Sequence, residues 1–205
     1  MMKTIDEIFD DITLIGETPN LIFKTQLPDK IFDEVKLWIE PMRKIKDDPY
    51  AELLNHRNGG TDHNSYQIAV PRSMIDHSFF YGYILHFGQI YLRSIYPSNE
   101  TFKDFRSRAV QLRNYSGHYD GYDCWLNFTY KGDDNPVHSH AGSLSSIIYI
   151  KDKDCEPTHF PSIGYVHEPK EGEILLFPSH LNHYVATKQT DSERISASFN
   201  LDVFG

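Results

Sequence analysis

The segment RISASFNLDV, residues 194–203, alternates apolar and polar side chains along its whole length. Successive side chains of a β-strand point to opposite faces, so this segment predicts a strand with one apolar and one polar face. The apolar face carries Ile195, Ala197, Phe199, Leu201 and Val203. The polar face carries Arg194, Ser196, Ser198 and Asn200. If the apolar face packs outward against helices, the polar face lines the interior of a barrel or sandwich, where it is open to a ligand.

Other short apolar runs precede this segment, from about residue 108 onward. β-Branched and aromatic residues dominate these runs, and turn residues separate them at close intervals. The runs are AVQLRNY, YDCWLNFTY, SLSSIIYI, EILLFP and NHYVAT. Short strands at regular spacing are typical of a β-sandwich, jelly roll or barrel. The sequence therefore predicts a β-rich core over residues 108–205.

The first half of the chain, residues 1–107, is expected to be mainly helical support for this core. Residues 28–40, PDKIFDEVKLWIE, place apolar side chains at helical spacing, and Pro41 follows them. A second apolar stripe at helical spacing covers residues 73–95. A chain of 205 residues is long enough for one sizeable core. We expect one α+β, β-rich domain over residues 1–205.

The charge and composition of the chain restrict its possible binding partners and its cellular compartment. The formal net charge of −9 argues against nucleic acid or an anionic membrane as a partner. The chain has no apolar stretch near the roughly 20 residues needed to cross a bilayer, and its first residues lack the apolar run of a signal peptide. Two cysteines are too few for a disulfide framework, which fits the cytoplasm. Nothing in the sequence indicates an oligomeric state.

Two histidines separated by one residue, His138 and His140, lie in NPVHSH directly before the run SLSSIIYI. Alternate residues of an extended segment point to the same side, so both imidazoles could bind one ion. His183 lies 45 residues after His138, in FPSHLNHYV. One short motif plus a distant histidine, with open positions left, is typical of non-haem iron oxygenases. The other interpretation of the two histidines is a solvated loop.

Arg194 opens the last predicted strand, on its polar face, 11 residues after His183. A guanidinium binds a carboxylate bidentately, so Arg194 could hold one end of a molecule whose other end chelates the metal. Ser196 lies two residues further on the same face and could donate a hydrogen bond to the same carboxylate.

The order of these segments resembles a known family. RNYSGHYDGYDCWLN, NPVHSH, SLSSIIYI, GEILLFPSHLNHYV and RISASFNL are similar to the small 2-oxoglutarate/Fe(II)-dependent dioxygenases of bacteria and phages, which are prolyl-hydroxylase-like. The resemblance covers about residues 108–203. It implies a double-stranded β-helix, that is, a jelly roll or cupin-like fold, with flanking N-terminal helices. It also implies Fe(II) as cofactor, 2-oxoglutarate as co-substrate, and O₂.

The resemblance carries over to individual residues. His138 resembles the proximal histidine ligand and His183 the distal one, and Arg194 matches the residue that binds the distal carboxylate of 2-oxoglutarate. Tyr149 matches a tyrosine whose hydroxyl reaches that carboxylate; the other interpretation is an aromatic core residue. Asn127 could be a polar lining residue near the co-substrate. No catalytic residue beyond the iron centre is expected.

One position departs from the family pattern of His-x-Asp or His-x-Glu, because the third position here is His140. Three neutral imidazoles carry one negative charge fewer than two imidazoles and a carboxylate, which should weaken Fe(II) binding without forbidding it. We expect His140 to be the third ligand, with Asp134 or a water as the alternative. His180 would point away from His183 in an extended segment, so we expect it at the surface.

The implied reaction couples the oxidative decarboxylation of 2-oxoglutarate to the hydroxylation of a C–H bond. A prolyl residue of a protein or peptide is the expected substrate by analogy alone, and a free amino acid or small metabolite fits the sequence equally well. Residues 151–172 and 55–66 are candidate lids over the substrate. The alternative function is a non-catalytic jelly-roll module that binds zinc. Arg194 argues against this alternative, since a structural zinc site has no use for an inward arginine.

Overall fold

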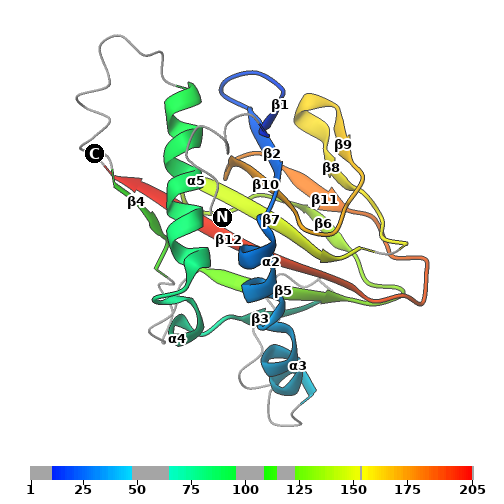
Figure 1. Ribbon diagram of the computed structural model, residues 1–205. Coiled ribbons are helices and arrows are strands. Elements are labelled where there is room, and N and C mark those ends of the chain that lie inside the picture. Colours follow the sequence, from blue (N-terminus) through cyan, green and yellow to red (C-terminus); the bar gives the residue numbers. More distant parts are fainter. Residues whose placement is uncertain (1–10, 48–64, 96–108, 115–122, 153, 205) are drawn as a thin grey trace.

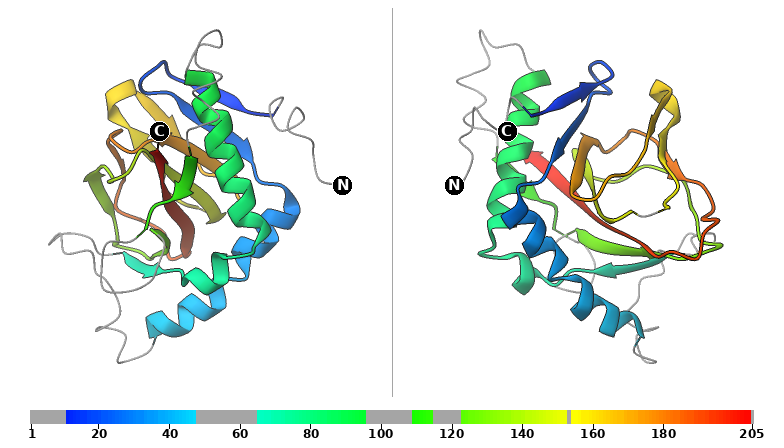
Figure 2. Two further views of the ribbon diagram at one scale, coloured as in Figure 1. Left: turned by 90° about the vertical axis from the view of Figure 1, so that its left-hand side faces the viewer. Right: turned by 45° about the vertical axis from the view of Figure 1, so that its right-hand side comes forward.

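The strands in the described part of the chain form two sheets, and helices cover the outer face of the larger one (Figure 1). The computed structural model describes residues 11–47, 65–95, 109–114, 123–152 and 154–204. The architecture is the jelly roll that the sequence predicts, β-rich with few helices (Figure 2).

The larger sheet has β12 at its centre, paired with β7 on one side and with β5 and β4 on the other. Within the described residues this sheet has eight strands, in the order β1-β2-β10-β7-β12-β5-β3, with β4 paired only to β12. Their bounds are β1 Thr13–Ile15, β2 Ile22–Gln26, β3 Tyr66–Ala69, β4 Ala109–Leu112, β5 Cys124–Thr129, β7 Leu144–Lys151, β10 Glu173–Pro178 and β12 Arg194–Phe204.

The smaller sheet has the strand order β6-β11-β8-β9. Its strands are β6 Asn135–His138, β8 Thr158–Phe160, β9 Tyr165–His167 and β11 His183–Val185, with the short 3₁₀ helix Pro161–Ile163 between β8 and β9. The candidate lid at 151–172 is therefore in large part a hairpin of this sheet. Of the other candidate lid, 55–66, only Ser65 and Tyr66 lie within the described residues.

The α-helices within the described residues are α2 Asp29–Lys36, α3 Ile39–Asp47, α4 Arg72–Ile75 and α5 Phe79–Ile95. Both predicted helices are divided. Pro41 does not end the first one but lies in the first turn of α3, where a missing N–H costs nothing because no carbonyl precedes it in the helix. The second is interrupted at His77, whose φ of 67° is left-handed, and Ser78 then accepts the Tyr81 N–H as the cap of α5.

The first half of the chain also contributes strands, which the prediction of a mainly helical half did not include. β2 pairs with β10, and β3 pairs with β5, so both extend the larger sheet. Strands this short carry little periodicity of their own. Pairing with neighbouring strands decides their conformation, and each of the two has at least one such neighbour far away in the sequence.

The two faces of β12 divide as the alternation in RISASFNLDV predicts. Its apolar face packs against α5 in the main hydrophobic core, where the rings of Phe80 and Phe199 meet edge to face at 5.7 Å. Figure 2 shows α5 lying along this outer face of the sheet. The polar face of β12 turns toward the smaller sheet and lines a pocket.

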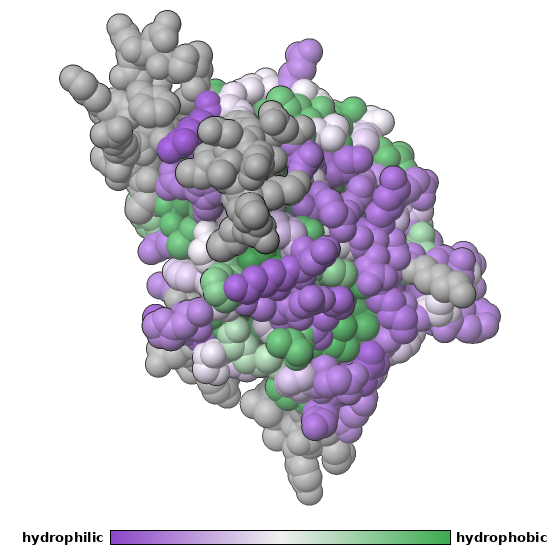
Figure 3. Space-filling model, in the orientation of Figure 1, coloured by the Kyte–Doolittle hydropathy of each residue, from purple (hydrophilic) through white to green (hydrophobic). Residues whose placement is uncertain are grey.

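The molecular face shown in Figure 3 is mostly hydrophilic, with small hydrophobic areas between the polar side chains. Of the helices in the described ranges, none combines the length and the apolar character needed to cross a membrane.

Candidate active site

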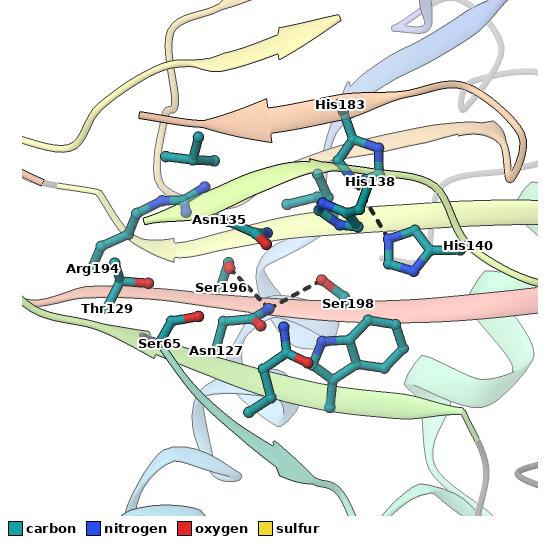
Figure 4. Close-up of a pocket in the computed structure, with 14 residues that line it drawn as sticks. Ser65, Asn127, Thr129, Asn135, His138, His140, His183, Arg194, Ser196 and Ser198 are labelled. Atoms are coloured by element: carbon teal, nitrogen blue, oxygen red, sulfur yellow. Dashed lines mark hydrogen bonds between the residues drawn. The ribbon is translucent and has the colours of Figure 1, made fainter. Parts of the chain in front are cut away.

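A pocket lies between the two sheets, over the polar face of β12 (Figure 4). Most of the site residues predicted from the sequence line it, although they come from distant parts of the chain. They are Asn127 from β5, His138 from β6, His140 from the loop after β6, His183 from β11, and Arg194 and Ser196 from β12. Tyr149 of β7 does not line the pocket but packs beside Arg194.

The three histidines converge because β6 and β11 pair antiparallel, with His138 directly opposite His183. His140 follows two residues later, and its backbone N–H donates to the Ser179 carbonyl at 2.9 Å. The candidate ligand atoms of the three side chains all lie within 4.8 Å of one another. Within the described part of the chain, Asp134 does not belong to this group.

Hydrogen bonds orient two of the imidazoles. His138 Nδ1 lies 2.7 Å from the Pro136 carbonyl oxygen, and His183 Nδ1 lies 3.0 Å from the Leu181 carbonyl oxygen. A carbonyl only accepts, so each Nδ1 carries the hydrogen and each Nε2 keeps a lone pair for a metal. His140 Nε2 lies 3.3 Å from His183 Nε2. Two nitrogens bound about 2.1 Å from a shared ion have roughly this separation.

The environment keeps two of the imidazoles, those of His140 and His183, neutral, as metal ligands must be. Burial, followed by the neighbouring His183 and His138, lowers the pKa of His140 to about 2. Burial lowers the pKa of His183 to about 3. The rings of Phe160 and Phe177 pack 5.7 Å and 5.0 Å from the His183 ring. Three imidazoles at this spacing fit a divalent transition metal.

Arg194 is a buried cation, with 4% of its surface exposed. Among the described residues its Nε has no hydrogen-bond partner, and its Nη2 makes one long contact, 3.5 Å to the Thr158 hydroxyl. No acidic side chain in the described ranges pairs with it. Burying an unpaired charge is costly, so this guanidinium fits an anionic group that enters the pocket.

Tyr149 combines both interpretations made from the sequence. It is 1% exposed and belongs to the apolar cluster between the sheets, as a core aromatic would. Its ring centroid also lies 5.7 Å from the Arg194 guanidinium carbon, and its hydroxyl donates to Thr158 Oγ1 at 2.8 Å. Sequence analysis missed Thr158, because β8 lies in a segment read as a loop.

Asn127 lies opposite Ser196 in the β5–β12 ladder. Its Nδ2 donates to Ser196 Oγ at 3.4 Å and to Ser198 Oγ at 3.2 Å (Figure 4). Its Oδ1 is buried and finds no partner within the described part of the chain. Sequence analysis missed several other lining residues, among them Trp125 and Thr129. The alternation of side chains along the strand CWLNFT could have identified Trp125 and Thr129, because both lie on the same face of the strand as Asn127.

His180 is exposed, as predicted, and its Nε2 lies 3.1 Å from Asn20 Oδ1. It is not part of the group formed by His138, His140 and His183.

Residues 153–200 match the sequence model of the family described as putative 2OG-Fe(II) oxygenase. The matched segment contains His183, Arg194 and Ser196, whereas His138 and His140 precede it. No curated protein matches the chain.

Solved structures with a similar fold include several prolyl hydroxylases. A Pseudomonas putida prolyl-4-hydroxylase is 16% identical, with a TM-score of 0.54 over 87% of this chain and 91% of that chain. A viral collagen prolyl hydroxylase from Paramecium Bursaria Chlorella virus-1, in complex with 2OG, is 12% identical, with a TM-score of 0.52 over 88% and 94%. A Phytophthora capsici prolyl 4-hydroxylase is 14% identical, with a TM-score of 0.51 over 88% and 58%. At these identities the likeness shows the jelly-roll fold.

Proposed function

We propose that this chain, a 2OG-Fe(II) oxygenase and thus an oxidoreductase that uses Fe(II), 2-oxoglutarate and O₂, hydroxylates a C–H bond of an organic substrate. A prolyl residue of a protein or peptide is the substrate that we favour. The observation that carries the proposal is one pocket that holds three convergent imidazoles together with a buried arginine, for which the described residues offer no acidic partner.

His138, His140 and His183 would hold the iron through nitrogen lone pairs. For His138 and His183 these are the Nε2 lone pairs, since each Nδ1 donates to a backbone carbonyl. When bound, Fe(II) with 2-oxoglutarate and O₂ supplies the oxidant: one oxygen atom enters the substrate C–H bond, and the other leaves in succinate, with release of CO₂. Three protein ligands leave positions open for the co-substrate and O₂.

Arg194 would bind the far carboxylate of 2-oxoglutarate while the other end of the molecule reaches the metal. Its burial strengthens this attraction, because little water competes for either charge. Three neutral imidazole ligands would not offset the positive charge of the metal. The full charge would then attract the other carboxylate of 2-oxoglutarate, the one at its metal-binding end. Ser196 lines the same pocket and would complete the binding of the co-substrate.

The similar fold of prolyl hydroxylases is the support for a prolyl substrate. This support is an analogy of fold, and the reaction class rests instead on the pocket and the family match.

The first test is an anaerobic titration of the Fe(II)-loaded protein with 2-oxoglutarate, followed by the weak visible charge-transfer band of the chelate. We expect a band in the wild type and at least tenfold weaker binding in Arg194→Ala, because a charge-assisted pair is lost. Arg72→Ala is the matched control, because Arg72 pairs with Asp76 outside the pocket. Absence of the band, with zinc retained through purification, would instead support the metal-binding module.

The second test concerns the substrate. The loaded enzyme is incubated with proline-containing peptides and, separately, with free proline, and products are analysed by mass spectrometry. A gain of one oxygen atom on peptide proline, matched by an equal amount of succinate, is expected. Oxygen on free proline alone, or on a residue other than proline, would contradict the peptidyl-proline substrate and leave the oxygenase reaction intact.

A further inference from the structure

Trp125 of β5 lies on the wall of the pocket, next to one of the candidate metal ligands. Its side chain is half-buried, and the centroid of its ring lies 5.5 Å from that of His140. The indole Nε1 is buried, and within the described part of the chain it has no hydrogen-bond partner. An indole N–H can only donate. Because a buried donor without a partner costs free energy, this N–H fits an acceptor that enters the pocket.

The pairing of β5 with β12 defines where this donor lies relative to Arg194. The cross-strand pairs on the pocket side are Thr129 with Arg194, Asn127 with Ser196, and Trp125 with Ser198. Figure 4 shows Arg194, Ser196 and Ser198 in this order along β12. Four residues of an antiparallel strand span about 14 Å. The backbone of Trp125 is therefore about this far along the ladder from the pair that contains Arg194.

The co-substrate already has partners for its polar groups in the proposed function. Arg194 and Ser196 bind the far carboxylate of 2-oxoglutarate, and the metal binds the other end. The Trp125 N–H is not needed for either end. It lies beside His140, where the C–H bond of the substrate must also come close to the metal. The unpaired donor is therefore left for the substrate.

The charge of the pocket determines which kind of acceptor fits this donor. Arg194 is the only lysine or arginine among the described residues that line the pocket, and the co-substrate would pair with it. A substrate carboxylate at Trp125 would thus meet a neutral donor, and burying a charge without a countercharge is costly. A neutral carbonyl, such as that of a peptide bond, accepts from an indole N–H without this cost.

We propose that Trp125 is a substrate-binding residue, whose indole N–H donates to a neutral amide carbonyl next to the C–H bond that is oxidised. This inference rests on the proposed function and narrows its substrate to a peptide or another amide, in place of a free amino acid. The ring of Trp125 adds an apolar surface against which the carbon skeleton of the substrate packs.

The first test measures two affinities in the Fe(II)-loaded full chain under anaerobic conditions. The ligands are 2-oxoglutarate and, in its presence, a blocked tripeptide with proline at its centre; free L-proline is titrated for comparison. Trp125→Phe keeps an aromatic ring but lacks the N–H. Trp38→Phe is the matched control, because Trp38 is the other tryptophan of the chain and is buried outside the pocket, with its ring 4.8 Å from that of Phe80. Calorimetry gives each Kd, and thermal unfolding is recorded for every variant.

We expect Trp125→Phe to weaken tripeptide binding about three- to tenfold, because one hydrogen bond is lost. The same variant should leave the affinity for 2-oxoglutarate unchanged. Trp38→Phe should change neither affinity. Free L-proline should bind more weakly than the tripeptide to the wild type.

A second measurement uses the wild-type protein and does not depend on the folding of Trp125→Phe. The full chain is labelled with ¹⁵N-tryptophan and loaded with 2-oxoglutarate and Zn(II), which has no redox chemistry. The tripeptide should move the indole proton signal of Trp125 downfield, as a new hydrogen bond does, and leave the Trp38 signal in place. Trp38→Phe assigns the two signals.

Several results would overturn the inference. Unchanged tripeptide affinity in a folded Trp125→Phe protein would remove the N–H from the substrate site. Weaker 2-oxoglutarate binding in this variant would assign the N–H to the co-substrate instead. Free L-proline that binds as tightly as the tripeptide, or a tripeptide that does not bind, would contradict the neutral amide. A wild type that fails to bind 2-oxoglutarate would contradict the proposed function itself.

Discussion

At the scale of single residues, His140 determines the charge of the candidate metal centre. Its ring lies 5.1 Å from that of His183 and 4.8 Å from that of His138, measured between centroids. The ring of Trp125 lies 5.5 Å away on another side. A neutral imidazole stands here where a carboxylate would add a negative charge. The site therefore attracts a divalent cation less strongly than a site with two histidines and one carboxylate.

Replacing His140 by aspartate should strengthen Fe(II) binding, because it restores the missing charge. We expect His140→Asp to tighten the Fe(II) affinity about tenfold, and His140→Ala to weaken it by a similar factor. The measurement is an anaerobic competition titration against a coloured chelator. His180→Ala is the control, since His180 is exposed and contacts Asn20. An affinity that is unchanged in His140→Ala would show that this imidazole is not a ligand.

At the scale of secondary-structure elements, Glu193 ties α3 to the start of β12. Its carboxylate accepts from the Arg43 guanidinium at 2.6 and 2.9 Å, from the Tyr130 hydroxyl at 2.9 Å and from Lys151 Nζ at 3.2 Å. Burial alone would raise the pKa of Glu193, but these hydrogen bonds lower it to about 2. Because the carboxylate is already paired, the acid next to Arg194 in sequence does not neutralise that guanidinium.

The hydrogen bonds to the Glu193 carboxylate should stabilise the folded protein within a defined pH range. Glu193→Gln should lower the free energy of unfolding by about 1–2 kcal/mol at pH 7, because charge-assisted hydrogen bonds are lost. The folded pKa of about 2 lies below the ordinary value of 4.5, so the unfolded state binds the extra proton between these values. The contribution is complete above pH 4.5 and disappears as the pH falls toward 2.

The check is urea unfolding of wild type and Glu193→Gln at pH 7 and pH 3. Asp191→Asn is the control, since Asp191 is exposed and pairs only with Lys131 among the described residues. Surface pairs of this kind contribute little to stability. A difference between wild type and Glu193→Gln that is as large at pH 3 as at pH 7 would argue against the ionised network.

Two glycines of α5 provide a matched pair for the packing of this helix on the sheet. A Cβ at Gly88 would lie 2.9 Å from both Leu201 Cδ1 and Val110 Cγ1, whereas a Cβ at Gly82 would meet nothing within 4 Å. Alanine in a helix is otherwise favoured over glycine by up to about 1 kcal/mol.

We therefore expect opposite signs for the two substitutions. Gly88→Ala should destabilise the protein by about 1–2 kcal/mol, because overpacking exceeds the gain in helix propensity. Gly82→Ala should stabilise it by up to about 1 kcal/mol. Chemical denaturation of both variants measures the two changes in the free energy of unfolding. Stabilisation by Gly88→Ala would show that α5 does not pack closely on β4 and β12.

At the scale of the whole molecule, the candidate site joins the two sheets. The three histidines come from the smaller sheet and the loop that follows β6, whereas Arg194 and Ser196 come from the larger sheet. A metal with a bound co-substrate would therefore connect both sheets through one molecule. Ligands that bind only the folded state stabilise it by mass action.

Divalent metal should therefore raise the unfolding temperature. At a free Fe(II) concentration 100 times the Kd, the stabilisation is about 2.7 kcal/mol. For a chain of this size, that corresponds to an increase in Tm of about 5–10 °C. Anaerobic thermal melts with metal, and with metal plus excess chelator, measure it. His183→Ala should lose the increase and His180→Ala should keep it; an equal increase in both variants would place the ion elsewhere.

The sequence by itself determined the character of the jelly-roll core and most of the candidate site. The alternation in RISASFNLDV separated a core face from a pocket face, because side chains of a strand alternate whatever the fold around it. The same rule placed His138 and His140 on one side of their segment, and Arg194 in line with Ser196. That these residues bind iron and 2-oxoglutarate stays a prediction.

Only the tertiary structure decided what depends on partners distant in the chain. β2, β3 and β8 each pair with at least one strand far away in the sequence, and their own few residues carry too little pattern to show this pairing. For the same reason Thr158 could not be seen beside Tyr149 and Arg194. Its position depends on how the two sheets pack against each other. That packing is stabilised by contacts between residues far apart in the chain, which no local sequence pattern encodes.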